Sequence, residues 1–384
     1  MTLEQIQSLF LKHKESTLFG RYITNNHITP LMGKLKDKLV VETIGKSVLG
    51  DSIYGIKIGR GDKRILMWSQ MHGNESTTTK AIFDLLNTLL DKNSDLESIL
   101  EACSLYIIPI LNPDGAKAYT RINANEVDLN RDAQNLSQPE SKILRTVFNN
   151  FKPHFCYNLH GQRTIFSAGN TNKPATISFL APAQDEVCAI TPNRKIAMEV
   201  IGVMNKTLQD IIPNQVGVYD DAFNLNCIGD TFQSENIPTI LFEAGHYKLD
   251  YEREFARELI YISYLSSLNY IANIEITGKN YKKYFEIPEN GTCFYDIIIR
   301  NTKVEASRDD LNDIGIQYQE KLVDNKIEFI PKVLVIDNLK GFYGHIEYDA
   351  KGLEVFGASG QLIQVDYENV FVILNNEKIS LLIK

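Results

Sequence analysis

Four short, continuous apolar segments, separated by segments of helical periodicity, limit the fold of this chain more than any other feature. The apolar segments are Arg64–Gln70, Ser104–Ile110, His154–His160 and Pro238–Ala244. Since they lack the polar–apolar alternation of a half-exposed strand, we expect strands that are buried on both faces. The helical patterns cover Thr77–Lys92, Ser137–Phe151, Pro192–Ile212 and Asp250–Asn273. This order predicts an α/β fold with a mostly parallel or mixed sheet covered by helices on both faces.

Two local signals predict where helices begin. The run Ser137-Gln-Pro-Glu140 has the form of a capping box, in which the serine and the glutamate satisfy free backbone amides of the first turn. Asp250 precedes the last helical pattern and is expected to cap that helix with its carboxylate.

The pattern changes after about residue 278, where short runs rich in Ile, Val, Tyr and Phe alternate with Gly, Asn and Asp. This texture is typical of β-strands joined by turns. The strongest runs are Phe294–Arg300, Lys326–Ile336, Phe342–Tyr348, Leu362–Tyr367 and Val370–Leu374. At roughly 100–200 residues per domain, the chain of 384 residues has room for two domains. We therefore expect an α/β domain over residues 1–276 and a small β-rich domain over residues 277–384.

Charge and cysteine content exclude several classes of protein. With 40 basic and 48 acidic residues, the chain lacks the overall basic character of a protein that binds nucleic acid through phosphate contacts. The five isolated cysteines form no CxxC pair, which argues against a thiolate metal cluster or a disulfide framework. No apolar run is long enough to span a membrane, and the start MTLEQIQSLFLKHKEST has no continuous apolar stretch. We expect a cytoplasmic protein without a membrane partner.

Four polar motifs lie at or directly after the ends of the predicted strands. They are His72-Gly-Asn-Glu75, Asn112-Pro-Asp-Gly115 followed by Arg121 and Val127-Asp-Leu-Asn-Arg131, Asn158-Leu-His-Gly161, and Phe242-Glu-Ala-Gly245. Each motif alone is as well explained by an ordinary polar loop or a structural side chain. In open α/β sheets, however, ligands bind outside the carboxyl ends of the strands. The four motifs in this order therefore predict one active site.

The residue types in these motifs suggest a metal-assisted hydrolysis. His72, Glu75 and His160 together offer a His₂Glu donor set, which binds catalytic zinc and leaves a coordination position for water. Glu243 offers a carboxylate that can take a proton from that water. Arg121 offers a fixed positive charge for a developing oxyanion.

The ordered set HGNE, NPDG, Arg121, VDLNRD, LHG and FEAG resembles the zinc carboxypeptidase family of the M14 type, especially its compact bacterial branch. The resemblance covers roughly residues 40–272. It implies one zinc ion per chain with His72, Glu75 and His160 as ligands. By the same resemblance, Arg121 polarises the scissile carbonyl and Glu243 is the base and proton shuttle. Asn130 and Arg131 would bind the C-terminal carboxylate of a peptide.

The chain departs from the family pattern at several positions. The family usually has Asp where Asn158 stands, so a carboxylate partner for that strand region is not assured. The family's peptidases carry a tyrosine in a mobile loop, for which Tyr219 is the candidate, although counting from Asp230 leads to Ala222 or Phe223. The position that sets specificity corresponds to Gly229 or Ile228, depending on how the residues are counted. Neither residue is charged. The neighbouring Asp230 nevertheless leaves open a preference for substrates with a basic side chain.

Two other functions compete with a carboxypeptidase. A zinc-dependent N-acyl-amino-acid deacylase, like succinylglutamate desuccinylase or aspartoacylase, shares the HGxE, arginine, DLNR and LHG motifs and a β-rich C-terminal domain. The third reading is an inactive module that only binds zinc and carboxylates. The retention of both Glu75 and Glu243 argues against it, since a pure binder needs no base. The sequence leaves the residue or acyl group that is released and the oligomeric state open.

Overall fold

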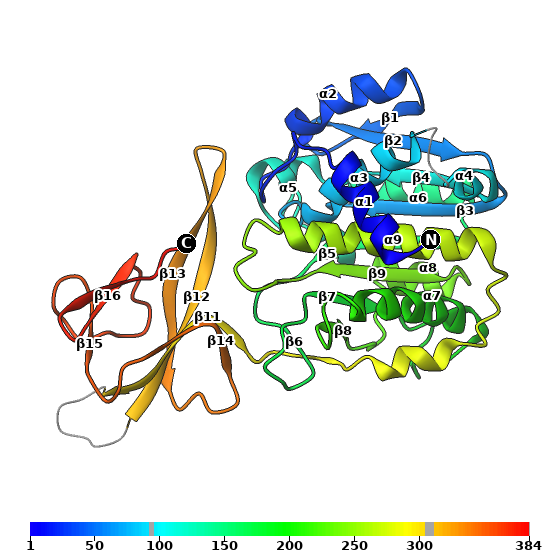
Figure 1. Cartoon of the computed structure of the whole chain (residues 1–384). Coiled ribbons are helices and arrows are strands. Elements are labelled where there is room, and N and C mark those ends of the chain that lie inside the picture. Colours follow the sequence, from blue (N-terminus) through cyan, green and yellow to red (C-terminus); the bar gives the residue numbers. More distant parts are fainter. Residues whose placement is uncertain (92–95, 304–310, 384) are drawn as a thin grey trace.

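A computed structural model describes residues 1–91, 96–303 and 311–383 of the chain (Figure 1). Its centre is a sheet with the strand order β1-β2-β4-β3-β5-β9-β7-β8. These strands span Val40–Lys46 (β1), Ser52–Gly59 (β2), Lys63–Ser69 (β3), Cys103–Ile108 (β4), Phe155–Gly161 (β5), Ile177–Leu180 (β7), Val216–Val218 (β8) and Thr239–Ala244 (β9). Strands β4, β3, β5 and β9 run parallel, and antiparallel pairs join β1, β2 and β7 to them. The sheet is therefore mixed, with a parallel centre.

Helices cover both faces of this sheet. They span Leu3–His13 (α1), Asn25–Lys36 (α2), Thr77–Leu89 (α3), Glu97–Ala102 (α4), Pro113–Ala118 (α5), Pro139–Phe151 (α6), Pro192–Gln209 (α7), Ile228–Ser234 (α8) and Glu254–Asn273 (α9). Alternate residues of β3 face opposite cores: Ile65 and Met67 pack with α1, α3, α7 and α9, whereas Leu66 and Trp68 pack with α6 and α8. Both faces of the strand are buried, which explains its unbroken apolar sequence and confirms the predicted fold class.

The predicted start signals of two helices had different outcomes. The capping box at Ser137 is wrong, because helix α6 begins after Gln138 and the Ser137 side chain instead donates to Asp132. The N-cap residue of α9 is Arg253 rather than Asp250, but the carboxylate of Asp250 does accept from the first-turn backbone amides of Glu254 and Ala256 at 2.8 and 2.9 Å. Helix α3 ends at Leu89, and the predicted end at Lys92 lies outside the described residues.

The C-terminal part consists of two further sheets, with the strand orders β13-β12-β11-β14 and β15-β16-β17. The strands span Phe294–Lys303 (β11), Leu311–Val323 (β12), Lys326–Asp337 (β13), Tyr343–Asp349 (β14), Val355–Phe356 (β15), Phe371–Leu374 (β16) and Glu377–Ser380 (β17). The predicted strand Leu362–Tyr367 is wrong, since within this segment the described structure has a single isolated bridge, between Leu362 and Phe356. Strand β12 was missed, although it forms one of the two central strands of its sheet.

The division of the chain into two domains stays a prediction, but the packing suggests a later boundary. Tyr284 and Ile287 belong to the core that contains α7 and α9. The short strand β10 (Asn290–Gly291) pairs with β6 (Ser167–Ala168) beside the large sheet. We therefore propose that the β-rich domain begins near Phe294.

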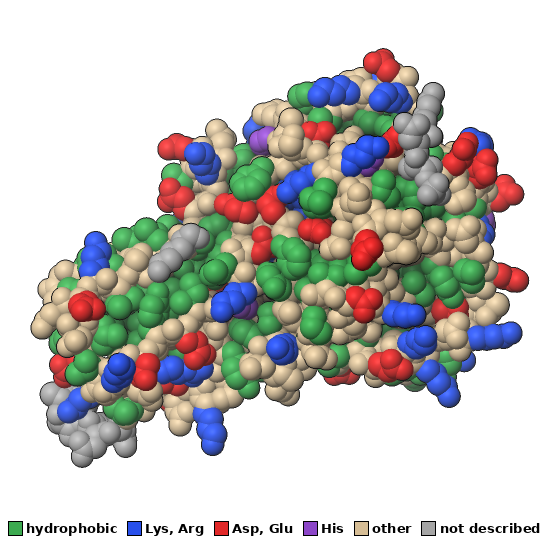
Figure 2. Space-filling model, viewed as in Figure 1, with side chains coloured by type: hydrophobic (Ala, Val, Ile, Leu, Met, Phe, Trp, Pro, Cys, Tyr) green, Lys and Arg blue, Asp and Glu red, His purple; other side chains and the backbone are tan. Residues whose placement is uncertain are grey.

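The surface mixes charges of both signs. Figure 2 shows acidic and basic side chains interspersed over the visible face of the large α/β part, and hydrophobic side chains gathered over the C-terminal sheets. All five cysteines are free, as the sequence predicts. Within the described residues, none of the helices combines the length and apolar character needed to cross a membrane.

A buried ion pair joins helix α3 to helix α9. Arg257 on α9 donates to both carboxylate oxygens of Asp84 on α3 at 2.6 Å, and both side chains are fully buried. We expect Asp84→Ala to lower the free energy of unfolding by about 3–5 kcal/mol, because the buried guanidinium loses its two-bond partner and keeps, among the described residues, only the ion pair to Glu254 at 3.1 Å. Urea denaturation followed by circular dichroism measures this. In the exposed pair Arg60–Glu101, 2.9 Å apart, Glu101→Ala should cost less than about 1 kcal/mol, and equal losses in both variants would contradict the prediction.

Candidate active site

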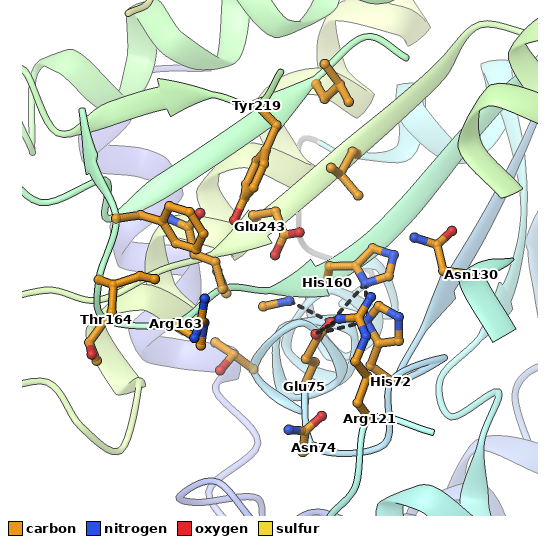
Figure 3. Close-up of a pocket in the computed structure, with 18 of the residues that line it drawn as sticks. His72, Asn74, Glu75, Arg121, Asn130, His160, Arg163, Thr164, Tyr219 and Glu243 are labelled. Atoms are coloured by element: carbon orange, nitrogen blue, oxygen red, sulfur yellow. Dashed lines mark hydrogen bonds and ion pairs between the residues drawn. The ribbon is translucent and has the colours of Figure 1, made fainter. Parts of the chain in front are cut away.

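The structure brings together the three residues predicted to bind metal. His72 and Glu75 lie on the turn after β3, and His160 lies near the end of β5, which pairs in parallel with β3. Gly73 makes this turn possible, because a Cβ atom there would lie 2.0 Å from the carbonyl carbon of Gly115. The tight turn at Gly73 therefore lets the side chains of His72 and Glu75 point to the same side as His160 (Figure 3).

The donor atoms of this group converge on one point. Nδ1 of His72 lies 2.9 Å from Oε1 of Glu75, and Nδ1 of His160 lies 2.9 Å from Oε2 of the same carboxylate. The two Nδ1 atoms are 3.0 Å apart. One ligand atom from each residue thus lies within 4.8 Å of the others. Two nearly buried imidazoles and a carboxylate at this spacing fit the His₂Glu set of a zinc site.

Opposing effects set the charges of these groups. Burial alone would raise the pKa of Glu75, but the adjacent His72 and His160 hold it well below its usual range. Burial opposes the charge of His72 as well, and Glu75 and Asp128 overcome it and raise its pKa. Burial and the neighbouring His72 lower the pKa of His160. A carboxylate anion beside a neutral imidazole is the form in which such residues bind metal.

Asp128 is a functional candidate that the sequence analysis did not single out. Its carboxylate lies 3.1 Å from Nε2 of His72, on the side of the ring opposite to Nδ1. Such a contact fixes the ring so that Nδ1 faces the metal position. Asp128 also accepts from Nε of Arg121 at 3.0 Å. Its place in VDLNRD, two residues before Asn130, was the signal that would have identified it.

Asn158 stands where the family usually has a carboxylate. In this chain Asp128, from another loop, supplies a carboxylate partner to His72. Within the described part of the chain, Nε2 of His160 has no hydrogen-bond partner and is buried, and the same holds for the side-chain oxygen of Asn158. Arg121, half exposed, lies 3.6 Å from Oε1 of Glu75 and faces the same space.

Glu243 faces the metal position from the neighbouring strand. It stands directly opposite His160 in the parallel pair of β5 and β9. Its Oε2 atom is buried without a hydrogen-bond partner among the described residues. Burial, and then the negative charge of Glu75, raise the pKa of Glu243 well above its usual range. A carboxyl group with a raised pKa beside a metal position is suited to accept and return a proton.

Tyr219 lies in the same cleft. Of the two positions favoured by counting along the sequence, Ala222 also lines the cleft, whereas Phe223 does not. The ring of Tyr219 points toward Glu243 in Figure 3 and packs against Phe166, with the ring centroids 5.3 Å apart. The backbone amide of Tyr219 donates to Phe179 at 3.0 Å, which holds the residue at the end of β8. Burial and the charges of Glu243 and Glu75 raise the pKa of its hydroxyl, which stays protonated and able to donate.

Asn130 and Arg131 line the same cleft, which has a volume of about 700 Å³. The side-chain oxygen of Asn130 accepts from the backbone amide of Ile228 at 3.2 Å, so its amide group is turned to a defined orientation. Of the two residues considered for specificity, Gly229 lines the cleft, whereas Ile228 is buried in the core beneath it. Asp230 lines the cleft as well, and burial raises its pKa to about 6.

Comparison with known proteins gives one family match. Residues 25–216, half of the chain, match the family described as zinc carboxypeptidase, Peptidase_M14. Carboxypeptidase SOL1 of Arabidopsis thaliana is 30% identical over 163 residues, which cover 36% of this chain and 33% of the plant protein. The chain thus matches about a third of that relative's length.

Solved structures agree in fold. A putative carboxypeptidase A from Shewanella denitrificans superposes with a TM-score of 0.53 at 18% identity, over 64% of this chain and 68% of its own. A metallo-carboxypeptidase from Burkholderia cenocepacia gives 0.53 at 15% identity, over 65% and 69%. At such identities the agreement concerns the fold alone.

Proposed function

The chain belongs to the zinc carboxypeptidase family M14, and from this premise we propose that it hydrolyses the C-terminal amide bond of substrates with a free carboxylate. The convergence of His72, Glu75 and His160 opposite Glu243 is the observation that carries the proposal. A His₂Glu set beside a partnerless carboxyl group meets the needs of metal-assisted hydrolysis, which are a metal with an open position and a nearby base.

The residues of the cleft fit a zinc ion, because the three donor atoms already lie close together and Asp128 orients one of the imidazoles. We propose His72, Glu75 and His160 as its ligands. When bound in such a site, zinc lowers the pKa of a water molecule to about 7 and polarises a carbonyl oxygen.

The remaining steps are assigned to side chains of this cleft. Glu243 accepts a proton from the attacking water and returns it to the nitrogen of the leaving amine. The guanidinium of Arg121 stabilises the negative charge that develops on the carbonyl oxygen. The protonated hydroxyl of Tyr219, which points toward Glu243, donates a hydrogen bond to the substrate.

Asn130 and Arg131 are proposed to bind the terminal carboxylate of the substrate. A guanidinium donates two parallel hydrogen bonds to a carboxylate, which fixes both position and orientation. Only a bond next to a free carboxylate then reaches Glu243 and the metal position. The released residue lies against Gly229 and Asp230 in the same cleft.

Arg131→Ala should raise KM by about 10–100-fold, since charged hydrogen bonds contribute about 1.5–3 kcal/mol. The measurement is steady-state hydrolysis of N-acylated peptides, each compared with the same peptide carrying a C-terminal carboxamide. We expect the carboxamides to resist cleavage by the natural chain. Arg60→Ala, which changes an exposed arginine outside the cleft, serves as control. Cleavage of both forms at equal rates would refute the role of the carboxylate.

A zinc-dependent deacylase is the second candidate, because it shares the same donor set. The position of Tyr219 beside Glu243 favours the peptidase, since deacylases of the resembling type lack that tyrosine. A panel of peptides and N-acyl amino acids, assayed with zinc, distinguishes the two. Zinc binding with no hydrolysis of any of them would instead support an inactive binding module.

A further inference from the structure

One end of the catalytic cleft is built by the C-terminal β-rich part. The side chains that line the cleft from β11, β12 and β13 are Asp296, Gln317, Tyr318, Glu320 and Phe329. They share one cleft with the metal-binding candidates of the α/β part. We call these five residues the end wall.

The end wall is fixed to the α/β part by hydrogen bonds on its inner side. The hydroxyl of Tyr251 donates to Asp296 at 3.0 Å, and both residues are buried. Nε2 of Gln317 donates to the hydroxyl of Thr164 at 2.5 Å, in the loop that follows β5. His345 on β14 contacts the carbonyl of Thr164 at 2.8 Å. These contacts hold the end wall against the loop that begins just after His160.

A second set of contacts fixes the other flank. Arg21 pairs with Glu320 at 3.0 Å, and neither side chain is strongly exposed. The hydroxyl of Tyr119, from the end of α5, donates to the same carboxylate. Figure 1 shows the C-terminal sheet standing beside one end of the large sheet. The end wall is therefore anchored to the α/β part at both flanks.

The position of the end wall relative to the metal decides which part of a substrate meets it. In Figure 3, Asn130 lies on one side of His72 and His160, and Arg163 and Thr164 lie on the other. If the terminal carboxylate binds at Asn130, the acyl side of the scissile bond runs toward Thr164. Thr164 is the residue to which Gln317 of the end wall is bonded. The acyl part therefore meets the end wall.

We propose that the end wall limits the acyl side of the cleft to short groups, so that the substrates are short peptides and N-acyl amino acids. This inference rests on the proposed function. The cleft volume of about 700 Å³ falls in the range of about 300–1,000 Å³ that is usual for small-molecule sites. A longer chain would have to displace the anchored Phe329, whose ring packs 5.4 Å from that of Tyr251.

The test is a series of N-acetylated peptides that share one C-terminal residue and carry an increasing number of residues before it. For the natural chain, kcat/KM should fall by at least about tenfold between the short and the long members, as for other steric discriminations. Phe329→Ala and Gln317→Ala should raise the ratio of kcat/KM for the long peptides to kcat/KM for the short ones. Phe371→Ala, at a half-buried phenylalanine of β16 outside the cleft, should leave the ratio unchanged.

Equal kcat/KM along the series would overturn the inference while leaving the proposed function intact. So would an unchanged ratio in both end-wall variants, provided that their thermal melting shows a folded chain. If no peptide is hydrolysed, the proposed function fails. Calorimetric titration of the same peptides into the Glu243→Gln protein then tests the end wall directly, and equal affinities for short and long peptides would refute it.

Discussion

Glu243→Gln should reduce kcat by roughly 10²–10⁴-fold, the usual contribution of a positioned acid–base group, and should leave the zinc content unchanged. Glutamine keeps the shape of the side chain but cannot take the proton from water or return it to the leaving amine. The metal should remain because Glu243 supplies none of the three donor atoms, and the residues that supply them are untouched. Steady-state kinetics and metal analysis of the same preparation measure both quantities.

The matched control for this variant is Glu199→Gln. Glu199 on α7 is also nearly buried, but it bonds to Tyr270 and Asn280, which do not line the cleft. Its replacement should leave kcat within about twofold, because no acid–base group is lost. Full activity in Glu243→Gln would remove it from the mechanism. Loss of zinc together with activity would instead indicate that Glu243 supports the metal site.

The convergence of the candidate site residues was predictable because the register of parallel strands is reflected in the sequence. Residues that end buried strands reach the same edge of a sheet. Ser69 pairs with Leu159 across β3 and β5, so the turn that carries His72 follows directly beside His160. His160 in turn pairs with Glu243 across β5 and β9. Apolar runs ending in polar motifs therefore determine both the fold class and the convergence of these residues.

The position of Tyr219 was harder to predict because it depends on a loop whose length does not follow from the family spacing. Counting from Glu243 or Asp230 assumes a fixed number of residues between them and the tyrosine. In the structure, pairing of β8 with β7 fixes Tyr219, and Asp221 is held by an ion pair to Arg194 on α7. Both depend on contacts distant in sequence.

The C-terminal part shows a second limit of sequence reasoning. Strand β12 is partly polar, because Gln317 and Glu320 line the cleft, whereas Ile314 and Ile316 fill the core of the sheet. A strand that mixes polar residues of a cleft with apolar core residues gives a weak apolar signal, and it was missed. Likewise, the strand patterns of the C-terminal part, taken one by one, did not indicate that β11–β13 would close one end of the cleft. This closure depends on packing between the C-terminal sheet and the large α/β part.

His160→Ala and His72→Ala should each abolish stoichiometric zinc binding and, with it, hydrolysis. Each variant leaves only two protein ligands of a set that binds zinc with three. The loss should also appear without any activity assay. A ligand that binds only the native state stabilises that state by about 4 kcal/mol when its free concentration is about a thousand times its dissociation constant. Zinc should therefore raise the melting temperature of the natural chain by several degrees and leave those of the two variants unchanged.

His154→Ala is the matched control for the metal site. His154 precedes the same strand β5, but it contacts Arg64 at the opposite end from His160. This variant should bind zinc and be stabilised by it like the natural chain. If all three variants still bound one zinc ion, the site would have to lie elsewhere, and the chemistry assigned to Glu243 and Arg121 would lose its basis. If only His154→Ala retains zinc, the metal is bound at the edge where β3 and β5 end.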